Sequence, residues 1–247
     1  MKIVLGVEYL GTNFHGWQRQ KSGVRTVQQV VEEALSRVAD EQIQVFCCGR
    51  TDAGVHAVEQ IIHFETTARR QQKAWVFGGN VNLPSDVNFL WAREVADDFH
   101  ARFNAIARQY NYKIHNTKTR SALLAAHSLW QPMPLDVQAM NTAAECLLGE
   151  HDFSAFQSSL CQAKSPIKTI EFIHFTKSGE HIILDIKANA FLHRMVRNIV
   201  GTLLKIGRGE REIGWLKTVL DSKQRQNAGS TAAPQGLYFV KGFYHQL

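Results

Sequence analysis

Residues 169–206 read TIEFIHFTKSGEHIILDIKANAFLHRMVRNIVGTLLKI, and this stretch decides the fold class. Residues 169–177 and 181–190 are strand-like runs, and the Ser-Gly-Glu tripeptide at 178–180 between them is typical of a hairpin turn. Residues 191–206 place apolar side chains at i, i+3 and i+4 spacing with almost no defect, which predicts an amphipathic helix. A hairpin followed by a helix predicts an α+β fold with antiparallel strands.

The surrounding sequence completes one repeated pattern. Residues 108–115 alternate like a strand, residues 135–148 are helical in spacing, and residues 237–243 read as a closing strand. With the hairpin and the helix above, the second half therefore follows the order β-α-β-β-α-β.

The first half repeats this order. Thr26, with Gln29 three residues later, has the spacing of a capping box, and residues 27–38 carry a clean apolar stripe, so a helix is expected to begin at Thr26. The other predicted elements are strands at residues 2–9, 43–47, 60–65 and 87–95 and a weaker helix near residues 70–80.

The repeated order predicts an internal duplication. We expect two similar, ferredoxin-like halves with mixed or antiparallel sheets, residues 1–105 and residues 106–247, joined near residues 104–107. Ligands usually bind in clefts at such domain junctions, so an active-site cleft is expected between the halves.

The overall charge is moderately positive, since 28 Lys and Arg face 22 Asp and Glu among 247 residues, a formal balance of +6. This excess suits a polyanionic partner, but an ordinary basic protein explains it equally well.

Several classes of protein lack support. The four cysteines have no zinc-site spacing, and the chain contains no HExxH motif, P-loop or glycine-rich dinucleotide fingerprint. Metal and nucleotide cofactors are therefore not expected. No signal peptide is predicted, and no apolar run approaches the roughly 20 residues of a membrane span, so we expect a cytoplasmic protein.

The densest candidate site is the segment CGRTDAGVHA at residues 48–57. It lies between two predicted strands and carries two glycines, so we expect a tight loop. Asp52 lies between Arg50 and His56 in this loop. On the residues alone, an aspartate that caps its own turn is the favoured interpretation, and a functional carboxylate is the alternative.

A second candidate lies on the strand at residues 108–115. Arg108, Tyr110 and Tyr112 have the same parity, so they project from one face. A cation and aromatic rings on one face can hold phosphates and stack bases, although ordinary cross-strand aromatic pairs are favoured by spacing alone.

The helix predicted at residues 191–206 offers a third candidate. Arg194 points away from the apolar stripe and is expected to be solvated. Arg197 lies at the edge of the stripe, so it is the better partner for a carboxylate.

The segment GRTDAGVHA at residues 49–57 resembles the signature of the TruA family of tRNA pseudouridine synthases. Further motifs that resemble this family follow in the family's order: GTNFHGWQRQ at 11–20, FHARF at 99–103, RQYNY at 108–112, GEHDF at 149–153, FLHRMVR at 191–197, and Ala228-Gly229 through Gly236-Leu237.

The resemblance implies a role for each matching residue. Asp52 occupies the position of the catalytic aspartate, Tyr110 that of a tyrosine that stacks on the target uracil and is proposed to help remove a proton, and Arg197 that of the arginine that pairs with the aspartate. Arg50 matches a residue linked to extrusion of the target base, and Leu237 matches an apolar residue that lines the pocket.

The resemblance also implies a homodimer without metal or cofactor. The implied substrate is the anticodon stem-loop of tRNA at positions 38 to 40, where the uridine is flipped out of its stack. The sequence leaves three routes open: attack of Asp52 on the sugar, removal of the C2′ proton to give a glycal, and attack on C6 of the uracil.

Two other functions compete with this one. A non-catalytic RNA-binding protein of the same fold would share the charge and the aromatic strand. A glycosidase or nucleosidase would generally need a second carboxylate, and no second carboxylate motif lies beside Asp52.

Overall fold

The computed structural model describes residues 1–159, 161–245 and 247. These residues form two compact units, the first made of residues 1–106 with 238–247 and the second of residues 107–237. The last ten residues of the chain belong to the first unit, although they follow the second unit in sequence.

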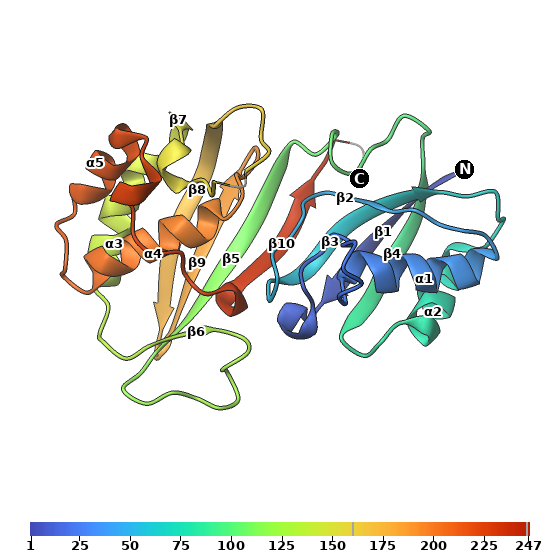
Figure 1. Ribbon diagram of the computed structural model, residues 1–247, viewed down its shortest axis with the longest axis horizontal. Coiled ribbons are helices and arrows are strands. Elements are labelled where there is room, and N and C mark those ends of the chain that lie inside the picture. Colours follow the sequence, from blue (N-terminus) through green and yellow to red (C-terminus); the bar gives the residue numbers. More distant parts are fainter. Residues whose placement is uncertain (160, 246) are drawn as a thin grey trace. The chain divides into compact units, whose positions relative to one another are not determined.

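The first unit is a sheet with two helices on one face (Figure 1). Strand β1 is antiparallel to both β3 and β4, and β2 is antiparallel to β3. The C-terminal strand β10 runs parallel to β3, where Tyr238 faces His56. The elements of this unit are β1 (Lys2–Tyr9), η1 (Gly11–Asn13), α1 (Val27–Ala39), β2 (Phe46–Cys47), β3 (His56–Glu65), α2 (Gln72–Asn82), β4 (Val87–Val95) and, from its second residue onward, β10 (Leu237–Phe243).

The core of the first unit forms where α1 packs on the sheet. Val27, Val31 and Leu35 of the predicted stripe are fully buried, and so are Leu5 and Val7 of β1. Burying such side chains is worth about 1.5–3 kcal/mol each, which fixes the helix against the strands.

The capping box predicted at Thr26 is wrong, although the helix does begin there. The Thr26 side chain makes no capping hydrogen bond, and its hydroxyl is buried without a partner in the described structure. Loop carbonyls satisfy the first helical N–H groups instead, since Val27 N donates to Gly16 O at 3.2 Å and Gln28 N donates to Trp17 O at 2.9 Å. The N-terminal end of α1 is therefore held by the backbone carbonyls of residues 16 and 17 and not by the Thr26 side chain.

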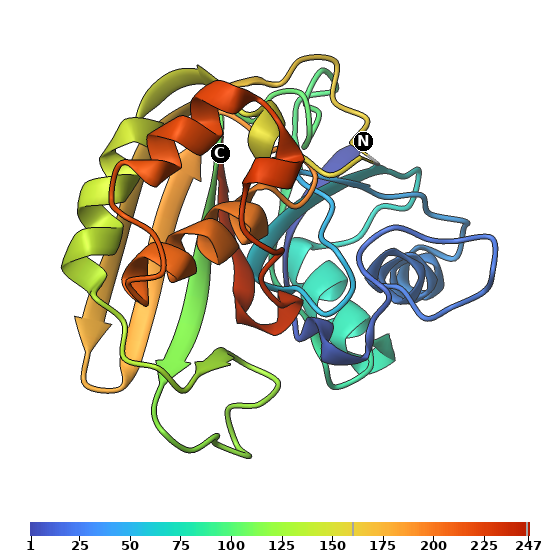
Figure 2. The same ribbon diagram turned by 60° about the vertical axis from the view of Figure 1, so that its left-hand side comes forward.

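The second unit is an antiparallel sheet in the order β5-β9-β8-β7, with β6 parallel to β5. Helices α3, α4 and α5 lie on one face of it (Figure 2). The elements are β5 (Ala107–Asn116), β6 (Leu129–Gln131), α3 (Val137–Ala144), η2 (Glu145–Leu147), β7 (Gly149–Asp152), η3 (Ser154–Phe156), β8 (Ile167–Ser178), β9 (His181–Ala188), α4 (Met195–Gly207), α5 (Trp215–Ser222), η4 (Arg225–Asn227) and η5 (Pro234–Gly236).

Helix α4 begins four residues later than the predicted start at residue 191. Arg194 has a φ of 62° in the left-handed region, which cannot continue a right-handed helix. From Met195 onward the predicted apolar pattern holds, and Val196, Ile199, Val200 and Leu203 are buried. The chain is therefore a mixed α+β protein with a mostly antiparallel sheet, as the hairpin and helix pattern predicts.

Candidate active site

The loop between β2 and β3 carries the predicted carboxylate, and β3 holds the start of this loop. Cys48 N donates to Ile61 O at 2.8 Å. The Gln60 amide donates to Gly49 O at 2.6 Å and accepts from Gly49 N at 3.3 Å. Gln60 is fully buried, so this double hydrogen bond fixes the loop where it leaves the sheet.

The N-terminal loop holds the other side of the same segment. Trp17 N donates to Thr51 O at 3.0 Å, and the hydroxyls of Tyr9 and Thr51 are 2.8 Å apart. A Cβ at Gly11 would lie 1.9 Å from the Val55 carbonyl oxygen, so only glycine allows this close approach. The motif at residues 11–20 therefore acts as a support for the loop at 49–57.

Asp52 is half-buried at the tip of this supported loop, and Arg50 is exposed. The turn is closed by Val55 N, which donates to the backbone oxygen of Asp52 at 3.2 Å, with Gly54 at a φ of 77°. The loop therefore fixes the backbone of Asp52 in a closed turn, and the residue is only partly removed from solvent.

His56, at the end of the same loop, has a structural role. Its Nδ1 accepts a hydrogen bond from Gly11 N at 3.0 Å, and its ring lies 4.6 Å from the Tyr238 ring. The side chain is fully buried, so it links the N-terminal loop to β10.

Only one of the two tyrosines on β5 keeps any access to solvent. Tyr112 is fully buried and donates to Ala233 O at 2.7 Å, so its ring is a structural aromatic, the interpretation that the spacing favours, and does not stack on a base. Tyr110 is 9% exposed and packs edge-on against the Phe191 ring at 5.0 Å. Arg108 donates to Asn189 O at 2.8 Å at the start of the strand.

Arg197 lies in the first turn of α4 and is partly buried. Its Nε donates to Ala232 O at 2.8 Å, which fixes the plane of the guanidinium. Burial raises the pKa of Tyr112, and the nearby charge of Arg197 opposes that rise. The second unit therefore brings Arg197 to the face of β5 that also carries Tyr110. Arg194 is exposed, as predicted.

The remaining predicted residue, Leu237, is 7% exposed at the first position of β10. Asp52 and Arg50 belong to the first unit, whereas Tyr110, Arg197 and Leu237 belong to the second.

The described residues offer neither a metal-binding cluster nor a membrane-spanning helix. They contain no group of three or more His, Cys, Asp or Glu side chains placed to hold a metal ion. None of the helices in residues 1–159, 161–245 and 247 has the length and apolar character to cross a membrane.

Comparison with known families identifies the class of this protein. A family model described as tRNA pseudouridine synthase matches residues 6–104 and 143–245, which include the Asp52 loop and the Arg197 helix. The chain therefore belongs to the tRNA pseudouridine synthase family.

Individual relatives are similar over nearly the whole chain. The protein named tRNA pseudouridine synthase A from Pseudomonas aeruginosa is 51% identical over 243 residues, 98% of this chain and 85% of that protein. The protein of the same name from Haemophilus influenzae is 49% identical over 246 residues, 100% of this chain and 91% of that protein. That from Alcanivorax borkumensis is 50% identical over 246 residues, 100% and 92% of the two chains.

Proposed function

We propose that this chain converts uridine to pseudouridine in tRNA. The observation that carries the proposal is identity of about 50% over nearly the full chain to proteins named tRNA pseudouridine synthase A. In the reaction, the bond from N1 to C1′ breaks, the uracil turns, and C5 bonds to C1′. C5 loses its proton and N1 gains one, so the product is an isomer of the substrate.

Asp52 is the proposed nucleophile of this reaction. Its support is its half-buried position on a loop held by hydrogen bonds from β3 and from the N-terminal loop. A carboxylate attacks carbon only in its ionised form, so Asp52 must be charged in the reacting complex. Three routes stay open: attack of Asp52 on the sugar, removal of the C2′ proton to give a glycal, and attack on C6 of the uracil.

The other proposed residues prepare the uridine and the carboxylate. Tyr110 stacks on the uracil, and such stacking is worth roughly 1–3 kcal/mol per base. Arg197 pairs with Asp52 and keeps it charged. Arg50 takes part in extruding the base, which suits its exposed position on the same loop as Asp52. Leu237 supplies an apolar contact in the pocket.

The proposed target is the anticodon stem-loop at tRNA positions 38 to 40, with the uridine flipped out of its stack. Flipping costs a few kcal/mol, which stacking on Tyr110 partly offsets. We further propose that the enzyme acts in the cytoplasm as a homodimer. Residues 1–105 and 106–247 are proposed to be ferredoxin-like halves, the first with the Asp52 loop and the second with Tyr110 and Arg197. The order β1-α1-β2-β3-α2-β4 supports this for the first half.

A non-catalytic RNA-binding protein of the same fold is the alternative function. The test is to map pseudouridine in tRNA from cells whose gene for this protein is deleted, before and after complementation. Our proposal predicts that pseudouridines in the anticodon arm disappear and then return. Unchanged modification in the deleted strain would favour the non-catalytic alternative.

A further inference from the structure

A polar pocket of about 480 Å³ opens in the second unit, where the first turn of α4 meets the segment after α5. None of its nine lining residues is acidic, aromatic or aliphatic. The lining carries three cations, Arg194, Lys223 and Arg225, and four hydroxyl side chains, Ser154, Ser158, Ser159 and Thr231.

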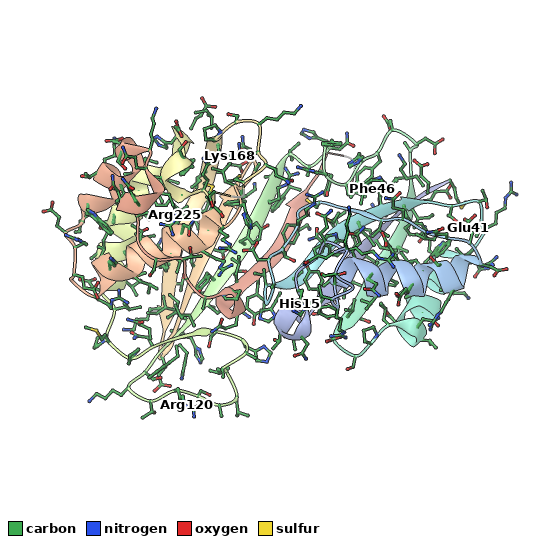
Figure 3. The ribbon with its side chains drawn as sticks, in the orientation of Figure 1. His15, Glu41, Phe46, Arg120, Lys168 and Arg225 are labelled. Carbon is green, nitrogen blue, oxygen red and sulfur yellow. The ribbon has the colours of Figure 1, made fainter. Side chains whose placement is uncertain are left out.

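Arg225 is a half-buried cation among neutral partners, and Figure 3 shows it beside helix α4. Its guanidinium donates to Gly229 O at 2.9 Å, Asn198 Oδ1 at 3.0 Å and Thr231 Oγ1 at 3.1 Å. Within residues 1–159, 161–245 and 247, no carboxylate pairs with it. Burial lowers its pKa, because nothing nearby compensates the loss of water.

The Arg225 guanidinium has more N–H groups than these three hydrogen bonds use. A guanidinium has five N–H groups, and the three hydrogen bonds leave two of them for another acceptor. A cation that is partly removed from water without a counter-charge is costly, and an anion that enters the pocket removes that cost.

Lys223 can move toward the same anion. Its ammonium lies 3.3 Å from Asp152 Oδ2, but the Lys223 side chain is 62% exposed. Exposed ion pairs contribute little to stability, so this one can open at small cost. The carboxylate of Asp152 is held separately, because Ser154 Oγ donates to its Oδ1 at 2.6 Å.

Two helix ends place cations at this pocket. The described chain has three non-glycine residues with positive φ, and two of them, Arg194 at 62° and Lys223 at 53°, line the pocket. Lys223 caps the C-terminus of α5, where a left-handed residue is common, and Arg194 directly precedes α4. The turns at these two helix ends therefore set both cations at the pocket wall.

The lining fits a phosphate rather than a base or a lipid, because it offers cations and hydroxyls without an aromatic or aliphatic side chain. A second hollow of about 670 Å³ is lined by residues 224–226 and 228–230, so Arg225 borders both. A polymer of phosphates can occupy both hollows at once, whereas a single ion can occupy only one of them.

We propose that Arg225, with Lys223 and Arg194, binds a backbone phosphate of the RNA substrate. This inference rests on the proposed function, since it assumes that the partner is tRNA. The site is a docking site for the RNA backbone and takes no part in the bond changes at the uridine.

The test measures the Kd for tRNA by filter binding over a range of salt concentrations. The variants are Arg225→Gln and Lys223→Gln, which remove a charge, and Arg225→Lys, which keeps it. Loss of one phosphate contact is expected to make the dependence of log K on log salt shallower by about one. The Kd at low salt is expected to rise about tenfold. Arg225→Lys is expected to keep most of the wild-type salt dependence.

The matched control is Lys177→Gln, which removes an exposed charge of the same unit outside the pocket. It is expected to match the wild type. Lys223→Gln leaves the hydrogen bonds of Arg225 in place, so an effect of this variant cannot arise from disruption of the 228–232 segment. Salt dependences equal to wild type in both Gln variants would overturn the proposal, as would an Arg225→Lys variant that behaves like Arg225→Gln.

A free anion is the remaining alternative for the pocket. Binding of a free anion is measured by thermal unfolding of the protein in inorganic phosphate, compared with unfolding in chloride at equal ionic strength. Stabilisation by phosphate that Arg225→Gln abolishes, together with unchanged tRNA binding, would assign the pocket to a free anion and overturn our proposal. Because RNA binding is measured without product formation, a failure of this proposal is distinct from a failure of the proposed reaction.

Discussion

Arg197 and Ala232 hold each other through two hydrogen bonds. Arg197 Nε donates to Ala232 O at 2.8 Å, and Ala232 N donates to Arg197 O at 3.1 Å. The first turn of α4 is thereby joined to the segment that leads to β10. The direction of the Arg197 guanidinium is therefore set by a stretch of chain 35 residues away.

Arg197→Lys is predicted to lower the rate of pseudouridine formation by about 10- to 100-fold, because lysine keeps the charge but lacks the Nε donor that orients it. The measurement is single-turnover product formation with saturating tRNA. Arg211→Lys, at an exposed site past the end of α4, is the control and should react like the wild type. A wild-type rate in Arg197→Lys would show that its orientation does not matter.

Tyr110→Phe is predicted to keep tRNA affinity and to slow the chemical step. Phenylalanine preserves the edge-on contact with Phe191, whose ring lies 5.0 Å away, and removes only the hydroxyl. The Kd for tRNA and the single-turnover rate separate the two effects. If the rate is unchanged, the hydroxyl has no part in proton transfer and Tyr110 acts by stacking alone.

Gly201→Ala is predicted to lower the free energy of unfolding by about 1–3 kcal/mol, because the new Cβ would lie 1.8 Å from Ser230 O. The matched variant is Gly78→Ala, inside α2. There the new Cβ would meet only the Val38 side chain, with Cγ2 at 3.4 Å and Cγ1 at 3.8 Å, so the gain in helix propensity should raise stability by about 0.5–1 kcal/mol. Urea unfolding measures the free energy of unfolding of both variants. Equal changes in the two variants would contradict the close packing of α4 against Ser230.

Stability is predicted to fall as the pH is lowered from 7 to 5, with His63 as one cause. Burial, aided by His100 and Lys2, lowers the pKa of His63 to about 4. Its ordinary pKa is about 6.5, so the unfolded chain takes up a proton first, and the contribution is complete above pH 6.5 and lost as the pH falls toward 4.

The variant that checks this contribution is His63→Asn, because the asparagine oxygen can replace Nδ1 as acceptor for Ala101 N, which lies 3.1 Å away. Urea unfolding at pH 7 and pH 5 should show a smaller stability difference in this variant than in the wild type. An equal difference in the two proteins would assign the pH dependence to other groups.

The sequence pattern predicts the periodic elements of this fold well. Strand β4 occupies residues 87–95 as expected, and the stripe at residues 27–38 becomes the buried face of α1. Both have regular apolar spacing, and such spacing is typical of elements that bury one face in a core. Helix α5 was not predicted, although Trp215, Leu216, Val219 and Leu220 have helical spacing.

Features that depend on remote chain partners were not predictable. The start of α1 is fixed by carbonyls of residues 16 and 17, and the start of α4 by the left-handed Arg194. Parity placed Tyr112 with Tyr110 but could not show that Tyr112 is fully buried. Nothing in the local sequence marks Arg225, because its partners at 198, 229 and 231 meet only in the folded chain.

The most direct test of the account concerns Asp52 as nucleophile. The measurement is tritium release from tRNA that carries uridine labelled at C5, with the wild type and with Asp52→Asn. Asparagine has nearly the same shape without the nucleophilic carboxylate, so we predict unchanged folding and tRNA binding with release at background level. Release at the wild-type rate from the folded, tRNA-binding variant would contradict the assignment of Asp52.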